Sequence, residues 1–430
     1  MPDDGSAVPR PQSLTRRTLL AGAVSVAGGA AFARWVHPMS QAPAPQGATP
    51  AAGTPPAAPA DPSRVPGLPS AALGARAPFE GPALAPTGVT MGASYTPLQA
   101  LHGTITPSDL HFQRHHNGIP VIDPSRYELL VHGLVERPLV FSLDDLRRFP
   151  PVTRTVFVEC SGNGRGAYRA PERDMTPQVV DGLTSTSEWT GVPVAAVLHE
   201  AGVRPGASWV LAEGGDAAVL SRSIPLEKML DDAVLAYAQN GEALRMANGY
   251  PVRLLLPGFE GNMNVKWLRR LEVNDRPTMT RQETARYTDP LPGGKSRLFS
   301  FVMDVKSVIT APSHPARLSG AGWWPVTGLA WSGRGHITRV DVSTDGGRTW
   351  AEAELTGPVL PLAHTRFVRM WRWDGRPARL MSRAVDETGS VQPTLAQFRA
   401  ARGAGTDYHY NYVRAWDVAA DGQVFFAVDE

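Results

Sequence analysis

The sequence lacks the residues that mark several common classes of protein. It has one cysteine, Cys160, in 430 residues, which excludes an intramolecular disulfide. Without a second cysteine or an H-E-x-x-H pattern, classical zinc sites are disfavoured. There is no G-x-S-x-G pattern of a serine hydrolase and no C-x-x-C-H site for covalent haem. With 42 basic and 40 acidic side chains, the net charge of +2 gives no general electrostatic reason to bind nucleic acid or an anionic membrane.

What is present indicates a folded, turn-rich chain of about two domains. Hydrophobic residues make up 42% and charged residues 19%, which excludes a wholly disordered chain. The 42 glycines and 40 prolines predict many turns and a low-complexity segment. We therefore expect a β-rich protein with an extension.

The first residues predict an export signal. Arg16 and Arg17 precede a short apolar stretch that ends at the small-x-small pattern Ala31-Phe32-Ala33, which is typical of a twin-arginine signal peptide over residues 1–33. The stretch is too short for a permanent membrane span, and Arg34 and a proline-rich run follow it; a retained anchor is the alternative. The prediction is cleavage after Ala33 and a periplasmic protein that is exported folded, often because it carries a cofactor.

Residues 34–90 are predicted to be a Pro/Ala-rich linker. Between Gln41 and Ser70 there are 9 prolines and 8 alanines in 30 residues, which is too little apolar surface for a core. Order is expected to begin near Thr90.

The folded part divides into an α+β domain, residues 91–290, and an all-β sandwich, residues 291–430. In the first domain, Ser142 caps a short helix that Pro150 ends, and the β-branched strand 152–158 delivers Cys160 to a loop. A helix is expected over 193–200, and strands over 252–256 and 265–273. In the second domain, six strands with no convincing helix between them are predicted at 305–310, 326–331, 337–343, 349–355, 367–373 and 380–385. A hairpin is expected at 344–347.

Two clusters of residues suit chemistry. One is Arg114-His115-His116-Asn117; the other is the loop from Cys160 to Arg165, in which a thiol lies five residues from a guanidinium. Positive charge lowers a thiol's pKa and favours the thiolate, the form that attacks electrophiles or binds soft metals. A small buried cysteine without a function is the alternative for Cys160.

Taken together, these clusters resemble motifs of the sulfite oxidase family of molybdopterin enzymes. Phe112-Gln113-Arg114-His115-His116 matches the family's F-x-R-N-H, and Cys160-Ser161-Gly162-Asn163-Gly164-Arg165 matches its C-A-G-N-R-R. Further along, Asn248-Gly249-Tyr250-Pro251-Val252-Arg253 matches H-G-F-P-V-R and Pro257-Gly258 matches P-G. Finally, Asn264-Val265-Lys266-Trp267-Leu268 matches H-V-K-W-L. The fold that the resemblance implies is a molybdopterin-binding domain followed by an immunoglobulin-like dimerisation domain.

The resemblance implies molybdenum bound to molybdopterin, with Cys160 as the one protein ligand of the metal. Arg114 and Arg165 would face an anionic substrate, and Tyr287 would be the active-site tyrosine; a packing role is its alternative. Arg402 is the nearest match to the arginine that the family's second domain contributes. The cofactor contacts would come from Phe112, Arg114, His116, Asp216, Asn248, Arg253, Asn264, Val265 and Lys266, with Arg253 and Lys266 suited to the pterin phosphate.

Departures from the family pattern bear on the substrate. Gly164 replaces the first arginine of the cysteine loop, and Asn248 replaces a histidine. The pattern resembles the SoxC group, the molybdenum subunits of sulfane dehydrogenases, which implies oxidation of sulfane sulfur on a SoxY-like carrier protein. A free sulfite dehydrogenase is the alternative.

The resemblance also implies partner proteins, and the absence of a C-x-x-C-H site in this sequence fits a haem on a separate subunit. Electrons would pass to a separate c-type cytochrome subunit that is SoxD-like, in a heterotetramer built on a homodimer of this chain. Trp323, Trp324, Trp331, Trp371 and Trp373 would form the sandwich core or, alternatively, such contacts.

Overall fold

The computed structural model describes residues 61–67, 69–291 and 293–428. The expected signal peptide, residues 1–33, and the linker up to residue 60 lie outside this range. Residues 82–430 form one compact unit, and its fold begins before Thr90, since β1 (Ala85–Thr87) already pairs with β2 (Gly92–Tyr95). No helix among the described residues is long and apolar enough to cross a membrane.

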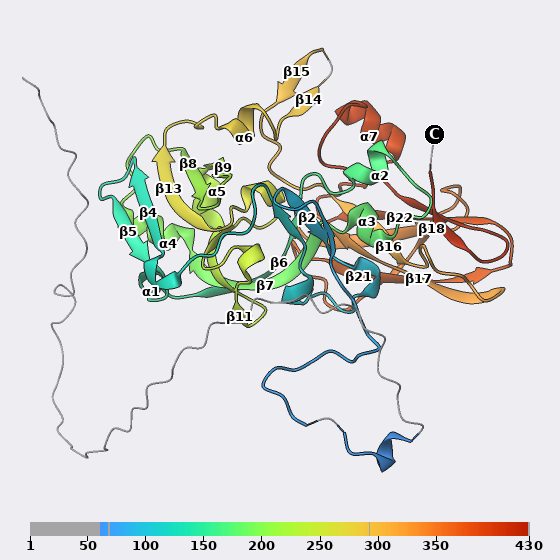
Figure 1. The fold of residues 1–430 in the computed structure, drawn as a ribbon. Helices are drawn as coiled ribbons and strands as arrows, with labels where there is room; N and C mark the ends of the chain where they lie inside the picture. The colour runs from blue at the N-terminus through green and yellow to red at the C-terminus, as the bar shows by residue number, and fades with distance from the viewer. Residues whose placement is uncertain (1–60, 68, 292, 429–430) are drawn as a thin grey trace, which may run out of the picture. The chain divides into compact units, whose positions relative to one another are not determined.

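The first half of the unit, blue through green to yellow in Figure 1, is the predicted α+β domain. Besides β1 and β2, its strands are β3 (Gln113–His115), β4 (Glu128–Gly133), β5 (Leu139–Ser142), β6 (Val152–Glu159), β7 (Thr184–Pro193), β8 (Trp209–Gly214), β9 (Ser221–Pro225), β10 (Val234–Gln239), β11 (Glu242–Ala243), β12 (Arg253–Leu255), β13 (Leu268–Asn274), β14 (Asp289–Leu291) and β15 (Lys295–Arg297). Its helices are α1 (Leu143–Leu146), α2 (Arg165–Arg169), α3 (Pro177–Asp181), α4 (Val194–Ala201), α5 (Leu226–Asp231) and α6 (Arg281–Thr284).

These strands form two main sheets, of order β11-β10-β7-β6 with β12 beside β10, and β5-β4-β13-β8-β9. The largest core lies between the second sheet and the helices α1, α4 and α5, where side chains such as Leu146, Leu198 and Met229 are buried. Burial of this apolar surface is the main force that fixes the scaffold.

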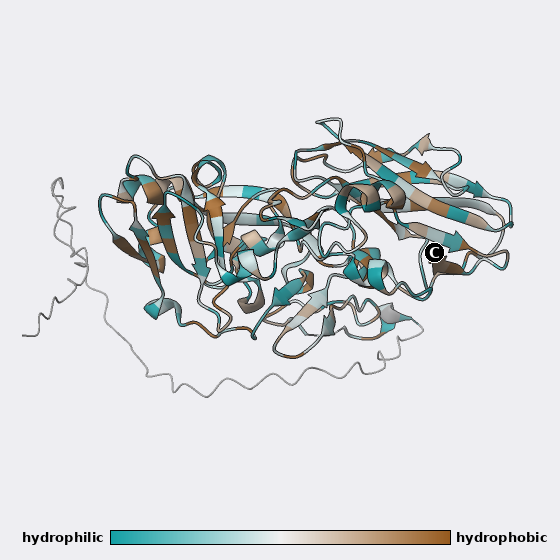
Figure 2. Ribbon diagram, turned by 90° about the horizontal axis from the view of Figure 1, so that it is seen from above, coloured by the Kyte–Doolittle hydropathy of each residue, from teal (hydrophilic) through white to brown (hydrophobic). Residues whose placement is uncertain are grey.

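The second half is a β-sandwich, as predicted. It contains β16 (Lys306–Ala311), β17 (Gly322–Trp331), β18 (Ile337–Ser343), β19 (Ala351–Glu352), β20 (Glu354–Thr356), β21 (Thr365–Trp373), β22 (Ala378–Asp386), α7 (Leu395–Arg402), β23 (Ala415–Val418) and β24 (Val424–Phe426). The sheets β16-β17-β21-β20 and β19-β18-β22-β23-β24 enclose a shared core. Hydrophobic and hydrophilic segments alternate along these strands (Figure 2), the pattern of a sheet with one buried face.

Several local predictions are confirmed. Ser142 caps α1 and forms a capping box with Asp145, β6 ends directly before Cys160, and Gly202 ends α4 with a positive φ of 73°. The hairpin at 344–347 joins β18 to β19.

Other local predictions need correction. Pro193 is the residue before α4 rather than part of its first turn. The strand expected over 265–273 begins at Leu268, because Trp267 has a positive φ of 53° that interrupts an extended chain. The strand expected over 349–355 is two short strands in different sheets, since β19 pairs with β18 and β20 with β21.

The second half also contains elements that were not expected. Helix α7, with Thr394 as its cap, follows the six predicted strands, and β23 and β24 complete the second sheet. The predicted tryptophan core holds for Trp331 and Trp373, which are buried, whereas Trp323 is exposed.

Candidate active site

Cys160 follows the last residue of β6 and is placed by main-chain hydrogen bonds. Its N–H donates to the carbonyl of Leu183 (2.9 Å), and its own carbonyl accepts from Asn163 N–H (2.8 Å). The amide side chain of Asn163 donates to Glu159 and to the carbonyl of Asp181, both at 2.9 Å. The cysteine loop is therefore rigid, and its thiol lines a pocket.

The pocket gathers most of the predicted site residues. Those that line it are Phe112, Arg114, His116, Cys160, Asp216, Asn248, Arg253, Asn264, Lys266 and Tyr287. These residues come from several separate motifs. The first and the last of them, Phe112 and Tyr287, are 175 residues apart in the sequence, and both line the pocket that contains the Cys160 thiol. Among the described residues there is no group of three or more His, Cys, Asp and Glu side chains that could hold a metal ion, so a metal here would rely on Cys160 and on donors from a cofactor.

Two cations of the pocket, Arg253 and Lys266, form no ion pair with a carboxylate among the described residues. Arg253 is 3% exposed; it donates to the carbonyls of Asn248 (3.0 Å) and Asn264 (3.1 Å), and its Nε has no hydrogen-bond partner. Lys266 Nζ donates to the carbonyl of Ala247 (2.7 Å). Burial lowers the pKa of Arg253 to about 9 and that of Lys266 to about 7. These cations fit an anionic group such as the terminal phosphate of a pterin.

Three histidines line the same pocket in their neutral form. Burial lowers the pKa of His111 to about 3 and of His116 to about 4, and it also lowers the pKa of His115. The Nε2 of His111 and the Nδ1 of His115 are buried without a partner. These unpaired atoms are further positions at which a polar cofactor fits.

Tyr287 and Arg114 stand near the thiol. The Tyr287 hydroxyl lies 2.9 Å from His116 Nε2, and the Arg222 guanidinium lies 5.1 Å from the centre of its ring. Burial raises the pKa of Tyr287, so it stays protonated and able to donate a hydrogen bond. Arg114 donates to the carbonyls of Gly92 (3.1 Å) and His115.

The thiol itself differs from the expectation. Burial raises the pKa of Cys160, and this outweighs the opposing effects of Arg114 and Arg165. In the free chain the cations therefore do not produce a low-pKa thiolate; a bound metal cation would favour the deprotonated form.

Three predicted residues lie outside the pocket lining. Val265 is buried in the main core. Arg165 donates from Nε (3.2 Å) and Nη2 (2.7 Å) to the carbonyl of Asp407. Arg402 forms ion pairs with Asp289 (3.7 Å) and Asp304, so its charge is already neutralised.

Other pocket residues were not singled out from the sequence. His111 immediately precedes the Phe112 motif, Asn262 lies two residues before the Asn264 motif, and Trp267 belongs to that motif but was given no role. Their nearness to the motifs was the available signal. Asn262 donates to Ser161 Oγ (3.0 Å) and to Glu260 (2.7 Å), which ties the cysteine loop to the next segment.

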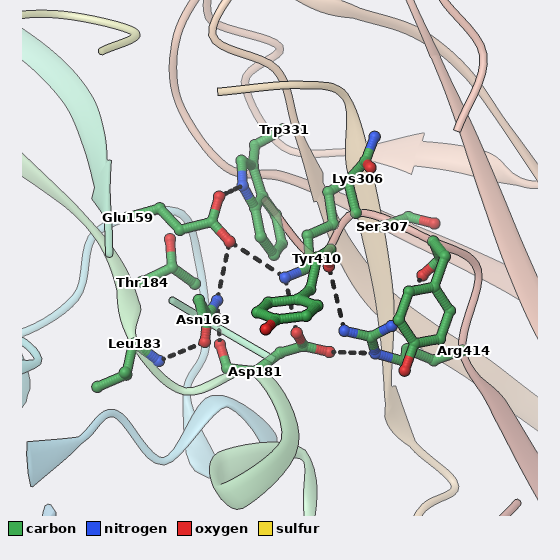
Figure 3. A network of polar contacts seen from close by, with 12 residues as sticks. Glu159, Asn163, Asp181, Leu183, Thr184, Lys306, Ser307, Trp331, Tyr410 and Arg414 are labelled. Atoms are coloured by element: carbon green, nitrogen blue, oxygen red, sulfur yellow. Dashed lines mark hydrogen bonds and ion pairs between the residues drawn. The ribbon is translucent and has the colours of Figure 1, made fainter. Parts of the chain in front are cut away.

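A buried charge network includes Glu159, the residue before Cys160 (Figure 3). Lys306 of β16 pairs with Glu159 (3.1 Å) and Asp181 (2.7 Å), and Arg414 pairs with Asp181 (3.4 Å). Trp331 donates to Glu159 at 2.7 Å. Burial alone would raise the pKa of Asp181, but Lys306 and Arg414 hold it below its ordinary value. Two cations of the second half thus neutralise two carboxylates of the first.

The network also explains Gly164 in the cysteine loop. Its φ is +93°, and a Cβ there would lie 2.3 Å from Nη2 of Arg414. An arginine at this position would require both a strained backbone and a different place for Arg414.

Comparison with known proteins shows the family of this chain. The oxidoreductase molybdopterin binding domain matches residues 116–282, and the Mo-co oxidoreductase dimerisation domain matches residues 297–415. A crystal structure of the sulfane dehydrogenase SoxCD from Paracoccus pantotrophus is 47% identical, covers 80% of this chain and 88% of its own, and has a TM-score of 0.78. The chain belongs to the sulfite oxidase family of molybdopterin oxidoreductases.

Other relatives show the range of the family. Mitochondrial sulfite oxidase of Mus musculus is 34% identical over 70% of this chain, and NADH nitrate reductase of Solanum lycopersicum is also 34% identical over 70%. The chain spans 60% of the first protein and 37% of the second. Membership of the family therefore establishes the type of cofactor, while the substrate and the direction of electron flow depend on the individual site.

Proposed function

We propose that this chain is the molybdenum subunit of a periplasmic sulfane dehydrogenase. The observation that carries the proposal is its 47% identity, over 80% of the chain, to a chain of the sulfane dehydrogenase SoxCD, against 34% to the sulfite oxidase. In this proposal the substrate is a sulfane sulfur on a cysteine of a carrier protein. Each step adds one oxygen from water to the sulfur and releases two electrons and two protons.

In this proposal the residues of the pocket have different roles. Cys160 would ligate molybdenum, and Arg253, Lys266, Asp216, Asn248 and the histidines would hold molybdopterin. When bound, this cofactor supplies oxygen-atom transfer and accepts the two electrons. Arg114 balances negative charge near the reacting sulfur, and the protonated Tyr287 donates a hydrogen bond there. His116, whose Nε2 lies 2.9 Å from the Tyr287 hydroxyl oxygen, holds that oxygen in place.

The proposal includes a partner and a compartment. Electrons leave to a c-type cytochrome subunit, and the two subunits form a heterotetramer around a dimer of this chain. The twin-arginine motif at Arg16 and Arg17 would direct the folded, loaded protein to the periplasm. Replacing both arginines by lysine should leave the protein in the cytoplasm, with molybdenum bound; a periplasmic product of unchanged amount would refute the export route.

Rapid mixing of the molybdenum-loaded protein tests the substrate. Free sulfite and a cysteine-persulfide peptide are added separately, and reduction of the metal centre is followed by its absorbance. The proposal expects reduction by the persulfide and little by sulfite, with Cys160→Ser as the inactive control. Fast reduction by sulfite alone would establish instead a free sulfite dehydrogenase, the second candidate that the sulfite oxidase relatives favour.

A further inference from the structure

The segment that follows α7, residues 403–412, lies against the cysteine loop. His409 N–H donates to the carbonyl of Ser161 (2.7 Å), next to Cys160. The segment is held in place from within and from behind: Tyr410 Oη donates to the carbonyl of Thr406 (2.8 Å), and Asn411 donates to the carbonyl of Val305 (3.1 Å). The second half of the chain therefore contributes a fixed wall beside the metal-ligand position.

Tyr408 is the residue of this wall that reaches the active-site tyrosine. Its ring centre lies 5.3 Å from that of Tyr287, with an angle of 39° between the planes. The guanidinium of Arg165 lies 5.2 Å from the same ring centre. Because Tyr287 lines the pocket and contacts His116, Tyr408 extends the aromatic surface outward from the site of reaction.

The same segment binds the side chain of Arg165. The Nε and Nη2 donors of this guanidinium both point to the Asp407 carbonyl, and these two donors form one of the edges with which an arginine binds an oxyanion in a bidentate manner. Arg402 is likewise paired with two carboxylates. Of the three arginines that the family pattern places around a small anion, Arg114 lines this pocket.

We propose that Tyr408 is a specificity-determining residue that favours sulfur carried on a peptide arm over a small free oxyanion. The tyrosine pair gives the backbone and methylene groups of such an arm a flat surface to pack on, and a free oxyanion has no comparable surface to bury. By contacting Arg165, Tyr408 also helps to keep that guanidinium directed toward Asp407. This inference rests on the proposed function, since it names what distinguishes the two candidate substrates.

The test compares Tyr408→Ala with Tyr408→Phe in the full, molybdenum-loaded chain. The probes are sulfite and a synthetic cysteine-persulfide peptide, and kcat and KM are measured for each. With Tyr408→Ala, KM for sulfite should fall about tenfold and kcat/KM for the peptide should fall about tenfold, the scale of one lost ring contact. Tyr408→Phe keeps the ring and should retain the wild-type ratio of the two efficiencies.

Binding of sulfate, which does not react, supplies a readout independent of turnover. Calorimetry should show tighter binding of sulfate to Tyr408→Ala than to the wild type. If the alanine variant is poorly folded, Tyr408→Leu keeps apolar volume without the ring and should change both readouts in the same direction. Unchanged efficiency ratios and unchanged sulfate affinity in folded variants would overturn the role of Tyr408. A wild type that prefers sulfite would instead overturn the proposed function, whereas the role of Tyr408 is decided by whether its loss shifts the ratio.

Discussion

Cys160 is positioned by main-chain hydrogen bonds that do not involve its sulfur, so its position and its chemistry are separable. Cys160→Ser should preserve those bonds and lose the soft ligand that molybdenum needs. We expect turnover at background, a strongly reduced molybdenum content and a change in unfolding free energy of about 1 kcal/mol or less. Metal analysis, steady-state rates and thermal unfolding measure the three quantities. Wild-type turnover in this variant would remove Cys160 from the metal site.

Lys266 is a cation whose pKa is depressed to about 7 in the folded chain, from an ordinary value of 10.5, mainly by burial. Between these pH values the unfolded chain binds more protons, so the stability of cofactor-free protein should rise as the pH increases from about 7 to 10. The slope contributed by Lys266 is at most about 1.4 kcal/mol per pH unit. Lys266→Met should remove this contribution.

Chemical denaturation of cofactor-free protein at a series of pH values measures the slope. Lys228→Met is the matched control for the loss of a lysine, because this lysine pairs with Asp232 (2.6 Å) and lies outside the pocket lining. Loaded protein should show a shallower slope, since a phosphate at Lys266 stabilises the ammonium form. Equal slopes in wild type and Lys266→Met would contradict a lowered pKa of Lys266 in the cofactor-free chain.

At the scale of elements, the helices and strands that were predicted correctly are those that depend on residues close together in the sequence. Elements that depend on tertiary contacts were missed. The capping box at Ser142, the strand before Cys160 and the alternating strands of the sandwich depend on neighbouring residues, and the sequence contains that information. Helix α7 depends on burying Phe398 against Tyr168 of α2, a contact between segments 230 residues apart. No local pattern shows such a contact in advance.

The same distinction applies to the site. The pocket residues that lie within the quoted motifs, such as Arg114 and Lys266, were predicted by resemblance and do meet. Arg165 and Arg402 also match motif positions, but their partners, Asp407 for the first and Asp289 and Asp304 for the second, come from other segments. Where a side chain points depends on those partners, which the motif does not include.

Strand β16 carries an element-scale prediction through Lys306. Lys306→Met would remove the cation that pairs with Glu159 and would leave Asp181 paired with Arg414. Breaking a buried ion pair from one side costs about 3–5 kcal/mol. Thermal and chemical unfolding should show this loss. Arg148→Met, which breaks an exposed pair with Asp145, should cost about 0.5 kcal/mol or less.

A double variant separates charge balance from packing. Lys306→Met with Glu159→Gln removes one charge of each sign and leaves Asp181 paired with Arg414. It should recover part of the stability lost in Lys306→Met. A double variant no more stable than the single one would show that the unpaired carboxylate of Glu159 is not the source of the loss.

At the scale of the whole molecule, the two halves share both charge and core. Phe157 of β6 packs in one cluster with Val308, Leu329 and Trp331 of the sandwich, and Lys306 and Arg414 neutralise carboxylates of the first half. Separating the halves would expose this cluster and leave four charges unpaired. We therefore expect residues 82–430 to unfold as one cooperative unit.

Native-state hydrogen exchange, read by mass spectrometry at increasing denaturant, tests this coupling. Peptides from β6 and from β16 should reach the same opening free energy, and Lys306→Met should lower both by an equal amount, because one transition exposes both strands. Arg148→Met should change neither by more than about 0.5 kcal/mol. If β16 opened at lower denaturant than β6, the sandwich would unfold independently, and the charge network that includes Glu159 would then be broken before the cysteine loop itself is lost.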